Sequence, residues 1–511
     1  MWKSVQNAKK WKQKAKSKLV YSQLVAETSL YWHDYETFGI DPQRDRPSQF
    51  AGVRTDVDLN IIDDPLVVYC KLPADYLPHP EACLLTGISP QLSESKGVNE
   101  VEFCRLIHEQ LAEPNTCSLG YNSIRFDDEF TRNCLYRNFY DPYAREWQNG
   151  NSRWDLIDVV RATKALRPDG INWPTNEEGR PSFKLEDLTK ANGIAHEAAH
   201  DALSDVYATI ALAKLIKTAQ PKLYQFLWQH RTKTEAYNLL QFGSFKPVVH
   251  VSGMYSVLNH RLAVVLPICK HPTNNNGIIV YDLSIGPDPL ISLSIEDIQQ
   301  RIFTATADLP EGVERIPLKT VHINKCPVLA PISVLKPDDQ QRLRLDLAAC
   351  HANIDKIKAA QGTAEKISAV FSENKFAEPG QEIDPDLAIY SGGFFSDADK
   401  QKMAKIRNIP SDQLANFKPK FTDPRLNEML FRYRARNYAG LLPPEELSKW
   451  QEFCANRISG TQQGGGITLA EYFSQLSRLR NETSSNEDFL NELESFALEK
   501  MRCLPGLAQM P

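Results

Sequence analysis

The chain has 511 residues, more than one hydrophobic core usually supports, so we expect two to four domains. Its composition is that of a globular protein, with 42% hydrophobic and 24% charged residues, and no apolar run is long enough to cross a bilayer, which excludes a membrane-spanning protein. The net charge of −5 argues against a nucleic-acid binder unless the positive residues are clustered.

The ten cysteines form no C-x-x-C pair, and no apolar signal segment opens the chain. We therefore expect reduced thiols in a cytoplasmic protein, not a disulfide framework or a zinc site. The first residues, "MWKSVQNAKKWKQKAKSKL", contain seven lysines and no acid. A solvated extension is the favoured interpretation of this start, and a basic tail that touches DNA is the alternative.

Strand and helix patterns alternate through the first two hundred residues, which predicts an α/β domain over 29–213. The predicted strands are 29–33, 66–71 and 116–119, and the predicted helices are 102–111, 128–138, 154–165 and 202–219.

After Gln220-Pro221 the chain turns to short β-rich runs such as "KPVVHVSGMY" and "NNNGIIVYDLS", broken by Gly, Pro and Asn. This texture predicts a small barrel or sandwich over 221–375. A linker rich in Pro, Gly and acids, "AEPGQEIDPDL", follows, and a mainly helical region over 378–511 completes a three-domain chain.

In the stretch "LYWHDYETFGI", Asp34 and Glu36 lie one residue apart at the end of an apolar run. Residues i and i+2 of a strand point to the same side, so the two carboxylates should project together. Because such a pair is costly in a partly buried site, we expect Arg or Lys side chains, or metal ions, between them.

Two further stretches could supply carboxylates to the same site. In "LGYNSIRFDDEF" an apolar strand leads to Asp127 and Asp128, and in "HEAAHDALSDVY" His200 precedes a helix that carries Asp205. His200 and Asp205 are about 140° apart on a helix, so His200 should lie in the loop before it. Taken singly, acids at a helix start are more simply explained as N-terminal residues that meet the helix dipole.

Taken together, the order D-x-E, N-x-x-x-F-D and H-x-x-x-x-D resembles the three motifs of DnaQ-like exonucleases, and His200 places the chain in the DEDDh group. Stretches such as "RFDDE", "NSRWDLIDVVRA", "RPSFKLEDLTKANGI" and "FRYRARN" resemble the bacterial exodeoxyribonuclease I family. The resemblance covers residues 29 to about 440. It does not include the lysine-rich start.

This resemblance implies a ribonuclease H-like exonuclease domain with a mixed sheet, an SH3-like β-rich domain and a helical C-terminal domain. It implies a hydrolase that removes nucleoside 5′-monophosphates processively from the 3′ end of single-stranded DNA, in DNA repair and recombination. A single-strand-binding scaffold and a 3′–5′ exoribonuclease of the same fold are the alternatives. We expect a monomer, and the resemblance leaves open a single-stranded DNA-binding protein as a second partner.

By the same resemblance, four carboxylates hold two Mg²⁺ ions, with Mn²⁺ as an alternative, and His200 is the general base. The four are Asp34, Glu36, Asp127 and Asp205. We prefer Asp127 to Asp128 because the acid of the family motif directly follows an aromatic residue.

Substrate-binding candidates come from Glu36 and from the basic, aromatic segment 131–167. Cations that follow a phosphate backbone and rings on which bases stack suit single-stranded DNA, and this selects Arg132, Tyr143, Trp147 and Arg161. Lys184 is added because the family commonly has a basic residue there. The alternative is that these rings are core and these Arg stems lie on the surface.

Two other stretches keep more than one interpretation. In "FRYRARNY", Arg432, Arg434 and Arg436 could contact DNA or form salt bridges between domains. The acids after Ser396, in "SDAD", have the spacing of metal ligands but are better explained as a helix start.

Overall fold

The structure is a computed structural model, and it describes residues 28–196, 200–372, 383–462, 464–482, 486–504 and 507. The lysine-rich start lies outside these residues, so neither interpretation of it is tested. Within the described part of the chain, no helix combines the length and apolarity needed to span a membrane. All ten cysteines are described and free, as expected for reduced thiols.

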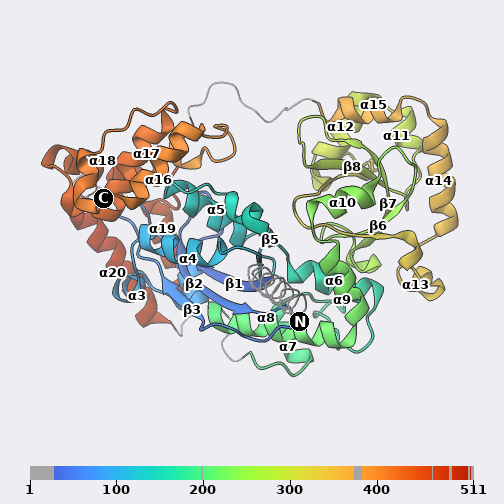
Figure 1. The fold of residues 1–511 in the computed structure, drawn as a ribbon, viewed down its shortest axis with the longest axis horizontal. Helices are drawn as coiled ribbons and strands as arrows, with labels where there is room; N and C mark the ends of the chain where they lie inside the picture. Colours follow the sequence, from blue (N-terminus) through green and yellow to red (C-terminus); the bar gives the residue numbers. More distant parts are fainter. Residues whose placement is uncertain are drawn as a thin grey trace, which may run out of the picture.

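A five-stranded mixed sheet forms the first domain, with the strands in the order β3-β2-β1-β4-β5 (Figure 1). The central strand, β1, is antiparallel to β2 and parallel to β4. The strands are β1 (Ser29–Thr37), β2 (Pro47–Thr55), β3 (Leu66–Tyr69), β4 (Thr116–Leu119) and β5 (Ser152–Arg153).

Helices cover both faces of this sheet, and successive side chains of β1 point alternately to one face and to the other. Leu30 and Trp32 belong to the core that includes α8, whereas Tyr31 and Tyr35 pack with Phe103 of α4. Asp34 and Glu36 are two and four residues after Trp32 in the strand and therefore point to the same face as Trp32, the one covered by α8. The helices are α2 (Pro80–Thr86), α3 (Pro90–Lys96), α4 (Glu100–Leu111), α5 (Asp127–Arg137), α6 (Leu156–Leu166), α7 (Leu185–Ala191) and α8 (Ala202–Ala219).

The middle domain contains an antiparallel sheet in the order β10-β6-β7-β8-β9. Its strands are β6 (Val248–Val251), β7 (Leu262–Lys270), β8 (Gly277–Asp282), β9 (Leu318–His322) and β10 (Val328–Pro331). The region has more helix than its β-rich sequence suggested, both before the first strand and around the sheet. These helices are α9 (Pro221–Gln229), α10 (Lys233–Leu240), α11 (Asp288–Ser292), α12 (Ile295–Phe303), α13 (Pro337–Arg342), α14 (Leu347–Ala359) and α15 (Thr363–Val370).

The C-terminal part is helical, as predicted. Ser396 caps the first of its α-helices by accepting a hydrogen bond from the backbone N–H of Asp399, so "SDAD" is a helix start and not a metal motif. The helices are α16 (Asp397–Asn408), α17 (Arg425–Tyr438), α18 (Pro444–Ser459), α19 (Leu469–Glu482) and α20 (Glu487–Cys503).

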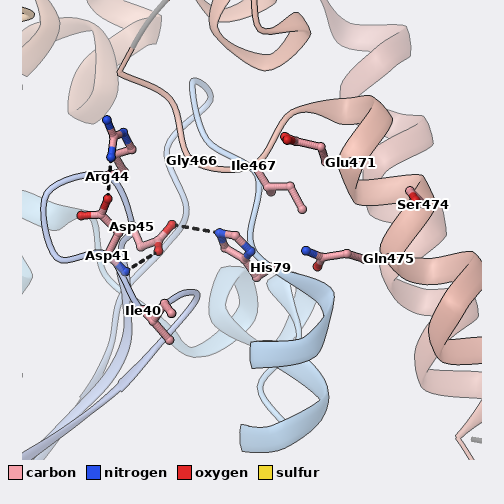
Figure 2. A pocket seen from close by; sticks show the side chains of 10 residues that line it. All are labelled: Ile40, Asp41, Arg44, Asp45, His79, Gly466, Ile467, Glu471, Ser474 and Gln475. Atoms are coloured by element: carbon pink, nitrogen blue, oxygen red, sulfur yellow. Dashed lines mark hydrogen bonds and ion pairs between the residues drawn. The ribbon is translucent and has the colours of Figure 1, made fainter. Parts of the chain in front are cut away.

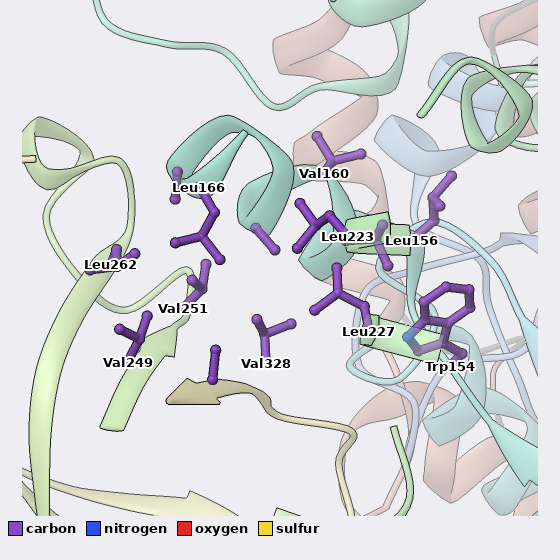
Figure 3. Close-up of a cluster of buried hydrophobic side chains, with 14 of the residues drawn as sticks. Trp154, Leu156, Val160, Leu166, Leu223, Leu227, Val249, Val251, Leu262 and Val328 are labelled. Carbon is purple, nitrogen blue, oxygen red and sulfur yellow. The ribbon is translucent and has the colours of Figure 1, made fainter. Parts of the chain in front are cut away.

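Continuous hydrophobic cores join the first domain to both of its neighbours. Figure 3 shows Trp154 and Val160 on the first-domain side, Leu227 of α9 between, and Val249 and Val328 of the middle domain in one cluster. A second cluster joins the segment after β1 to α18 and α19 of the C-terminal domain. The first domain is therefore held between the other two, which lie on opposite sides of it in Figure 1.

A buried ion-pair network, called here the arginine cluster, also ties the C-terminal helices to the first domain. Arg436 bonds Asp75 at 2.8 Å and Asp386 at 2.5 Å, and Arg457 bonds Asp75 at 2.8 Å. The cluster consists of Asp75, Asp384, Asp386, Arg432, Arg436 and Arg457. In "FRYRARNY" all three arginines form salt bridges, but only Arg436 forms one between domains, to Asp75. Arg432 pairs within the C-terminal domain, and so does Arg434, with Glu446 at 2.7 Å.

Candidate active site

The end of β1 brings Asp34 and Glu36 to the side of the sheet that α8 covers. Asp34 is half-buried and Glu36 is 7% exposed. Among the described residues, neither has a Lys or Arg beside it that favours its charged form. Of the two partners expected from the sequence, Arg or Lys side chains and metal ions, the described residues thus do not supply the first to Asp34 and Glu36.

Asp127 reaches the same strand from the first turn of α5. Its Oδ1 accepts a hydrogen bond from the backbone N–H of Tyr35 at 3.0 Å, between the two β1 acids. The loop before α5 is fixed by Asp155, whose carboxylate accepts backbone N–H bonds from Asn122 and Ile124. Asn122 has a positive φ of 67°, a conformation that asparagine tolerates better than most residues.

Asp128, the rival of Asp127, is engaged elsewhere. Arg145 lies 2.5 Å from its Oδ1 and Arg153 lies 2.7 Å from its Oδ2. Although burial opposes ionisation, these two guanidinium groups hold the pKa of Asp128 well below its usual range. Both oxygens of Asp128 are used inside the fold.

The third stretch brings His200 and Asp205 to the same site. Asp201 caps α8, so His200 lies in the preceding turn, as predicted, and Asp205 lies in the first turns of the helix. His200 has a positive φ of 66°, and its side chain is 39% exposed. Glu36, His200 and Asp205 each present a ligand atom within 4.8 Å of the others.

The acids of this group, called here the carboxylate cluster (Asp34, Glu36, Asp127 and Asp205), disfavour one another's charge. Burial and the neighbouring Asp34 raise the pKa of Glu36 to about 9. Burial also raises the pKa of Asp34 and of Asp127 well above the usual range, with Asp205 and Asp34 respectively adding to it. Oxygen donors arranged in this way fit hard divalent cations.

His196 is part of the site but was not selected from the sequence. Its Nε2 lies 2.5 Å from Oδ1 of Asp205, and its Nδ1 lies 3.2 Å from the hydroxyl of Thr189. Burial raises the pKa of Asp205, and His196 partly opposes this. The signal was present, because "HEAAHD" contains two histidines four residues apart, but the spacing to Asp205 directed attention only to His200.

The basic, aromatic segment 131–167 divides into buried and exposed residues. Trp154 is 2% exposed, as the alternative stated for the rings. Arg137 is not a surface residue, because it is buried and bonds Glu100 at 2.6 Å. Arg132 is also buried, bonds Glu146 at 2.7 Å and lies over the Tyr143 ring. It therefore presents no free cation to solvent.

Other candidates of the first domain remain accessible. Trp147 is 65% exposed, and Tyr143 is half-buried. Lys184 is exposed at the N-terminus of α7, whereas Arg161 pairs with Asp158 at 2.7 Å and keeps a side chain that is 14% exposed.

The C-terminal domain adds aromatic side chains beside these candidates. Phe394 is 86% exposed, and its ring lies 6.0 Å from that of Tyr143. The Tyr390 hydroxyl bonds Glu129, on the same helix as Arg132. The sequence stretch "GGFFSDAD" contains this ring, but nothing in its local pattern indicated that it would lie beside Tyr143.

A cavity of about 420 Å³ lies beyond the carboxylate cluster, between the loop after β1 and α19 (Figure 2). Asp45 and His79 form an ion pair across its wall at 3.4 Å, and Arg44 pairs with Asp41 at 2.7 Å. None of the five predicted catalytic residues lines it. The cavity is separate from the site described above.

Comparison with known proteins identifies the family. Three family models match in succession: Exonuclease at 31–213, Exonuclease I SH3-like domain at 231–373 and Exonuclease I C-terminal domain at 383–500. Exodeoxyribonuclease I of Haemophilus influenzae is 45% identical over 472 residues, which are 92% of this chain and 98% of that protein. The chain belongs to the exodeoxyribonuclease I family. Exodeoxyribonuclease I of Escherichia coli is 48% identical over 431 residues, 83% of this chain and 89% of that protein.

Solved structures of this family have the same fold. A moderately thermophilic exonuclease I from Methylocaldum szegediense superposes with a TM-score of 0.89 at 50% identity, over 93% of this chain and 99% of that one. E. coli exonuclease I in complex with a dA16 oligonucleotide superposes with a TM-score of 0.88 at 45% identity, over 93% of this chain and 100% of that one. Another E. coli structure is described as the zinc ion bound form of a complex with single-stranded DNA.

These findings confirm the predicted family, enzyme class and three-part fold. The chain is an exodeoxyribonuclease I, a metal-dependent 3′–5′ exonuclease of single-stranded DNA. The alternatives of a scaffold without chemistry and of an exoribonuclease receive no support from these relatives.

Proposed function

We propose that Asp34, Glu36, Asp127 and Asp205 hold two Mg²⁺ ions, which Mn²⁺ can replace, at the scissile phosphate of the 3′-terminal nucleotide. The observation that carries this proposal is the convergence of four carboxyl groups from β1, α5 and α8 with no Lys or Arg among the described neighbours that favours their charged forms. Such a group is costly unless cations neutralise it. Two divalent ions held by these carboxylates would supply the positive charge that activates an attacking water and stabilises a leaving 3′-oxygen.

Asp127 is the preferred ligand over Asp128 for a physical reason. The Tyr35 N–H holds Oδ1 of Asp127 beside the β1 acids, and no guanidinium group pairs with this carboxyl among the described residues. Asp128 carries two short ion pairs, to Arg145 and Arg153, which a metal ion would have to break. This supports the choice made from the aromatic residue before Asp127.

His200 is the proposed general base. Its half-exposed ring lies near Glu36 and Asp205, and Glu186 lies 3.9 Å from its Nε2. A neutral imidazole there can accept the proton of the attacking water. His196 cannot take this role, because it is 4% exposed and both of its ring nitrogens have partners. Hydrolysis in this geometry releases nucleoside 5′-monophosphates.

The strand is proposed to leave the site along exposed and partly buried residues of the first domain. Trp147 and Tyr143 offer rings for base stacking, and Lys184 and Arg161 offer cations to phosphates. Glu36 contacts the terminal nucleotide, and Arg132 contributes by holding the Tyr143 ring. Relatives solved with single-stranded oligonucleotides support a strand of this kind.

Several expectations from the resemblance stay predictions for this chain. They are processive digestion, roles in DNA repair and recombination, a cytoplasmic location, a monomeric state and a contact with a single-stranded DNA-binding protein.

The proposal is tested with purified protein and oligonucleotides labelled at the 3′ or 5′ end, both DNA and RNA, with Mg²⁺ or EDTA. We expect the 3′ label to be lost first from DNA, only with the metal ion, and we expect Asp34→Ala and Asp205→Ala to abolish hydrolysis while single-strand binding in EDTA persists. Asp64→Ala, at an exposed acid outside the site, is the matched control and should keep full activity. Robust Mg²⁺-dependent cleavage by either cluster variant would contradict the ligand assignment.

A further inference from the structure

His196 connects two helices at the carboxylate cluster. It follows α7, and its ring bridges Thr189 of α7 and Asp205 of α8 at 3.2 and 2.5 Å. The histidine side chain is 4% exposed, and Thr189 is 1% exposed. Water therefore has little access to the hydrogen bonds that the His196 ring forms with Thr189 and Asp205.

The partners fix which atom of His196 carries a proton. When Asp205 is ionised, as a metal ligand must be, its oxygens accept hydrogen bonds and do not donate them, so Nε2–H points at Oδ1 of Asp205. The Thr189 hydroxyl either donates to Nδ1 or, if it donates to the carbonyl of Glu186 at 3.0 Å, accepts from a protonated Nδ1. In both arrangements the imidazole holds the same oxygen of Asp205.

We propose that His196 is a positioning residue of the metal site: it holds Oδ1 of Asp205 by a hydrogen bond and thereby presents the other oxygen to a divalent cation. The inference rests on the proposed function, because it takes Asp205 to be a metal ligand. Groups that orient a metal ligand from outside the coordination sphere typically contribute 10- to 100-fold to metal affinity. His196 would thus act on Asp205, while His200 acts on the water.

The test is a titration of the full chain with Mn²⁺, without DNA, in which free Mn²⁺ is followed by electron paramagnetic resonance. His196→Ala should weaken the tightest Mn²⁺ site about 10- to 100-fold. His196→Gln, whose amide N–H can reach Asp205, should recover most of that affinity. Raised Mn²⁺ should also restore the turnover of His196→Ala, since the defect lies in binding.

A matched control is His250→Gln in β6 of the middle domain, another buried histidine, whose ring bonds the Tyr255 hydroxyl at 2.8 Å and none of the four acids. It should leave Mn²⁺ affinity unchanged. Equal losses in His196→Gln and His196→Ala with intact circular dichroism, or a loss in His250→Gln as well, would overturn the inference.

Asp205→Ala separates this inference from the proposed function. If Asp205→Ala weakens Mn²⁺ binding and His196→Ala does not, His196 has no positioning role and the metal site stands. If Asp205→Ala itself leaves Mn²⁺ binding unchanged, Asp205 is not a ligand and the proposed function fails with it.

Discussion

The carboxylate cluster beside β1 and the arginine cluster between the first domain and the C-terminal helices both gather acids away from water. The arginine cluster matches three aspartates with three guanidinium groups, and each arginine bonds at least two of the acids. Although burial opposes ionisation, Arg436 holds the pKa of Asp75 and of Asp386 below the usual range. Among the residues that the structure describes, no Lys or Arg favours the charged form of the carboxylate cluster in this way, and burial raises the pKa of its members.

The difference separates a structural network from the proposed catalytic site. Acids that the fold has already neutralised can only hold elements together. Acids that repel one another inside a fold are kept in that state by the rest of the structure, and a cation from solution relieves the repulsion. The four changes below test this contrast, beginning with the largest expected effect.

Removing the proposed base should affect the chemical step alone. His200→Ala should lower kcat by roughly 10²- to 10⁴-fold, the usual contribution of a positioned general acid–base group. Variants of the arginine cluster should show no such effect on kcat, because its arginines pair with Asp75, Asp384 and Asp386 and with no member of the carboxylate cluster. Single-turnover cleavage across pH measures this, and a near-normal rate with an unchanged pH profile would assign the base elsewhere.

Breaking the arginine cluster should affect stability instead. Arg436→Ala leaves Asp75 and Asp386 without a principal partner, and loss of one member of a buried ion pair costs about 3–5 kcal/mol of unfolding free energy. Chemical denaturation measures it, with Arg434→Ala, in a more exposed pair on the same helix, as the control. A stability change no larger than that of the control would mean that the network is not what joins the domains.

The two clusters should give opposite dependences of stability on pH. Glu36 in the metal-free fold has a pKa raised from 4.5 to about 9, so the folded state holds more protons and stability should fall as pH rises through that window. Asp75 and Asp386 have lowered pKa values, so their contribution is present above the ordinary value of 3.8 and is lost as pH falls below it.

Each proton that the folded state holds in excess changes the unfolding free energy by about 1.4 kcal/mol per pH unit. Mg²⁺ should displace these protons and so reduce the slope of unfolding free energy against pH above pH 4.5. Chemical denaturation from pH 5 to 9, in EDTA and in Mg²⁺, measures the pH dependence that the carboxylate cluster causes. Identical slopes with and without the metal ion would argue against cation binding at the carboxylate cluster.

The smallest effects concern the strand. Lys184→Ala and Arg161→Ala should each weaken oligo-dT binding in EDTA and flatten the dependence of log K on log salt by about one charge unit. Trp147→Ala should cost about 1–3 kcal/mol with little change in that slope. If the two basic variants keep the wild-type affinity and slope, the strand follows another path.

The sequence was sufficient for the elements whose pattern is local. The helix at 202–219 and the strand at 116–119 were predicted with the bounds that the structure shows, because long apolar periodicity and flanking turn residues mark them. The shared side of Asp34 and Glu36 follows from strand geometry alone. The family resemblance brought Asp127 and Asp205 to the same site.

What the sequence did not show depends on contacts between distant residues. β2 was missed, since "PSQFAGVRT" begins with Pro and mixes polar residues into a strand that is buried along its whole length only by its neighbours. The sequence predicted Arg132 as a phosphate ligand, but in the fold Glu129 and Glu146 form ion pairs with its guanidinium group. His196 is visible in "HEAAHD", but its contacts with Thr189 and Asp205 depend on how α7 packs against α8.

The most direct test of the central claim is the number of Mn²⁺ ions that the metal-free wild-type chain binds, compared with Asp34→Ala and with Asp64→Ala. If the carboxylate cluster is the metal site, wild type and Asp64→Ala bind two ions, and Asp34→Ala loses at least one of them together with hydrolysis. Binding of two ions by Asp34→Ala with wild-type affinity, or of none by the wild-type chain, would contradict it.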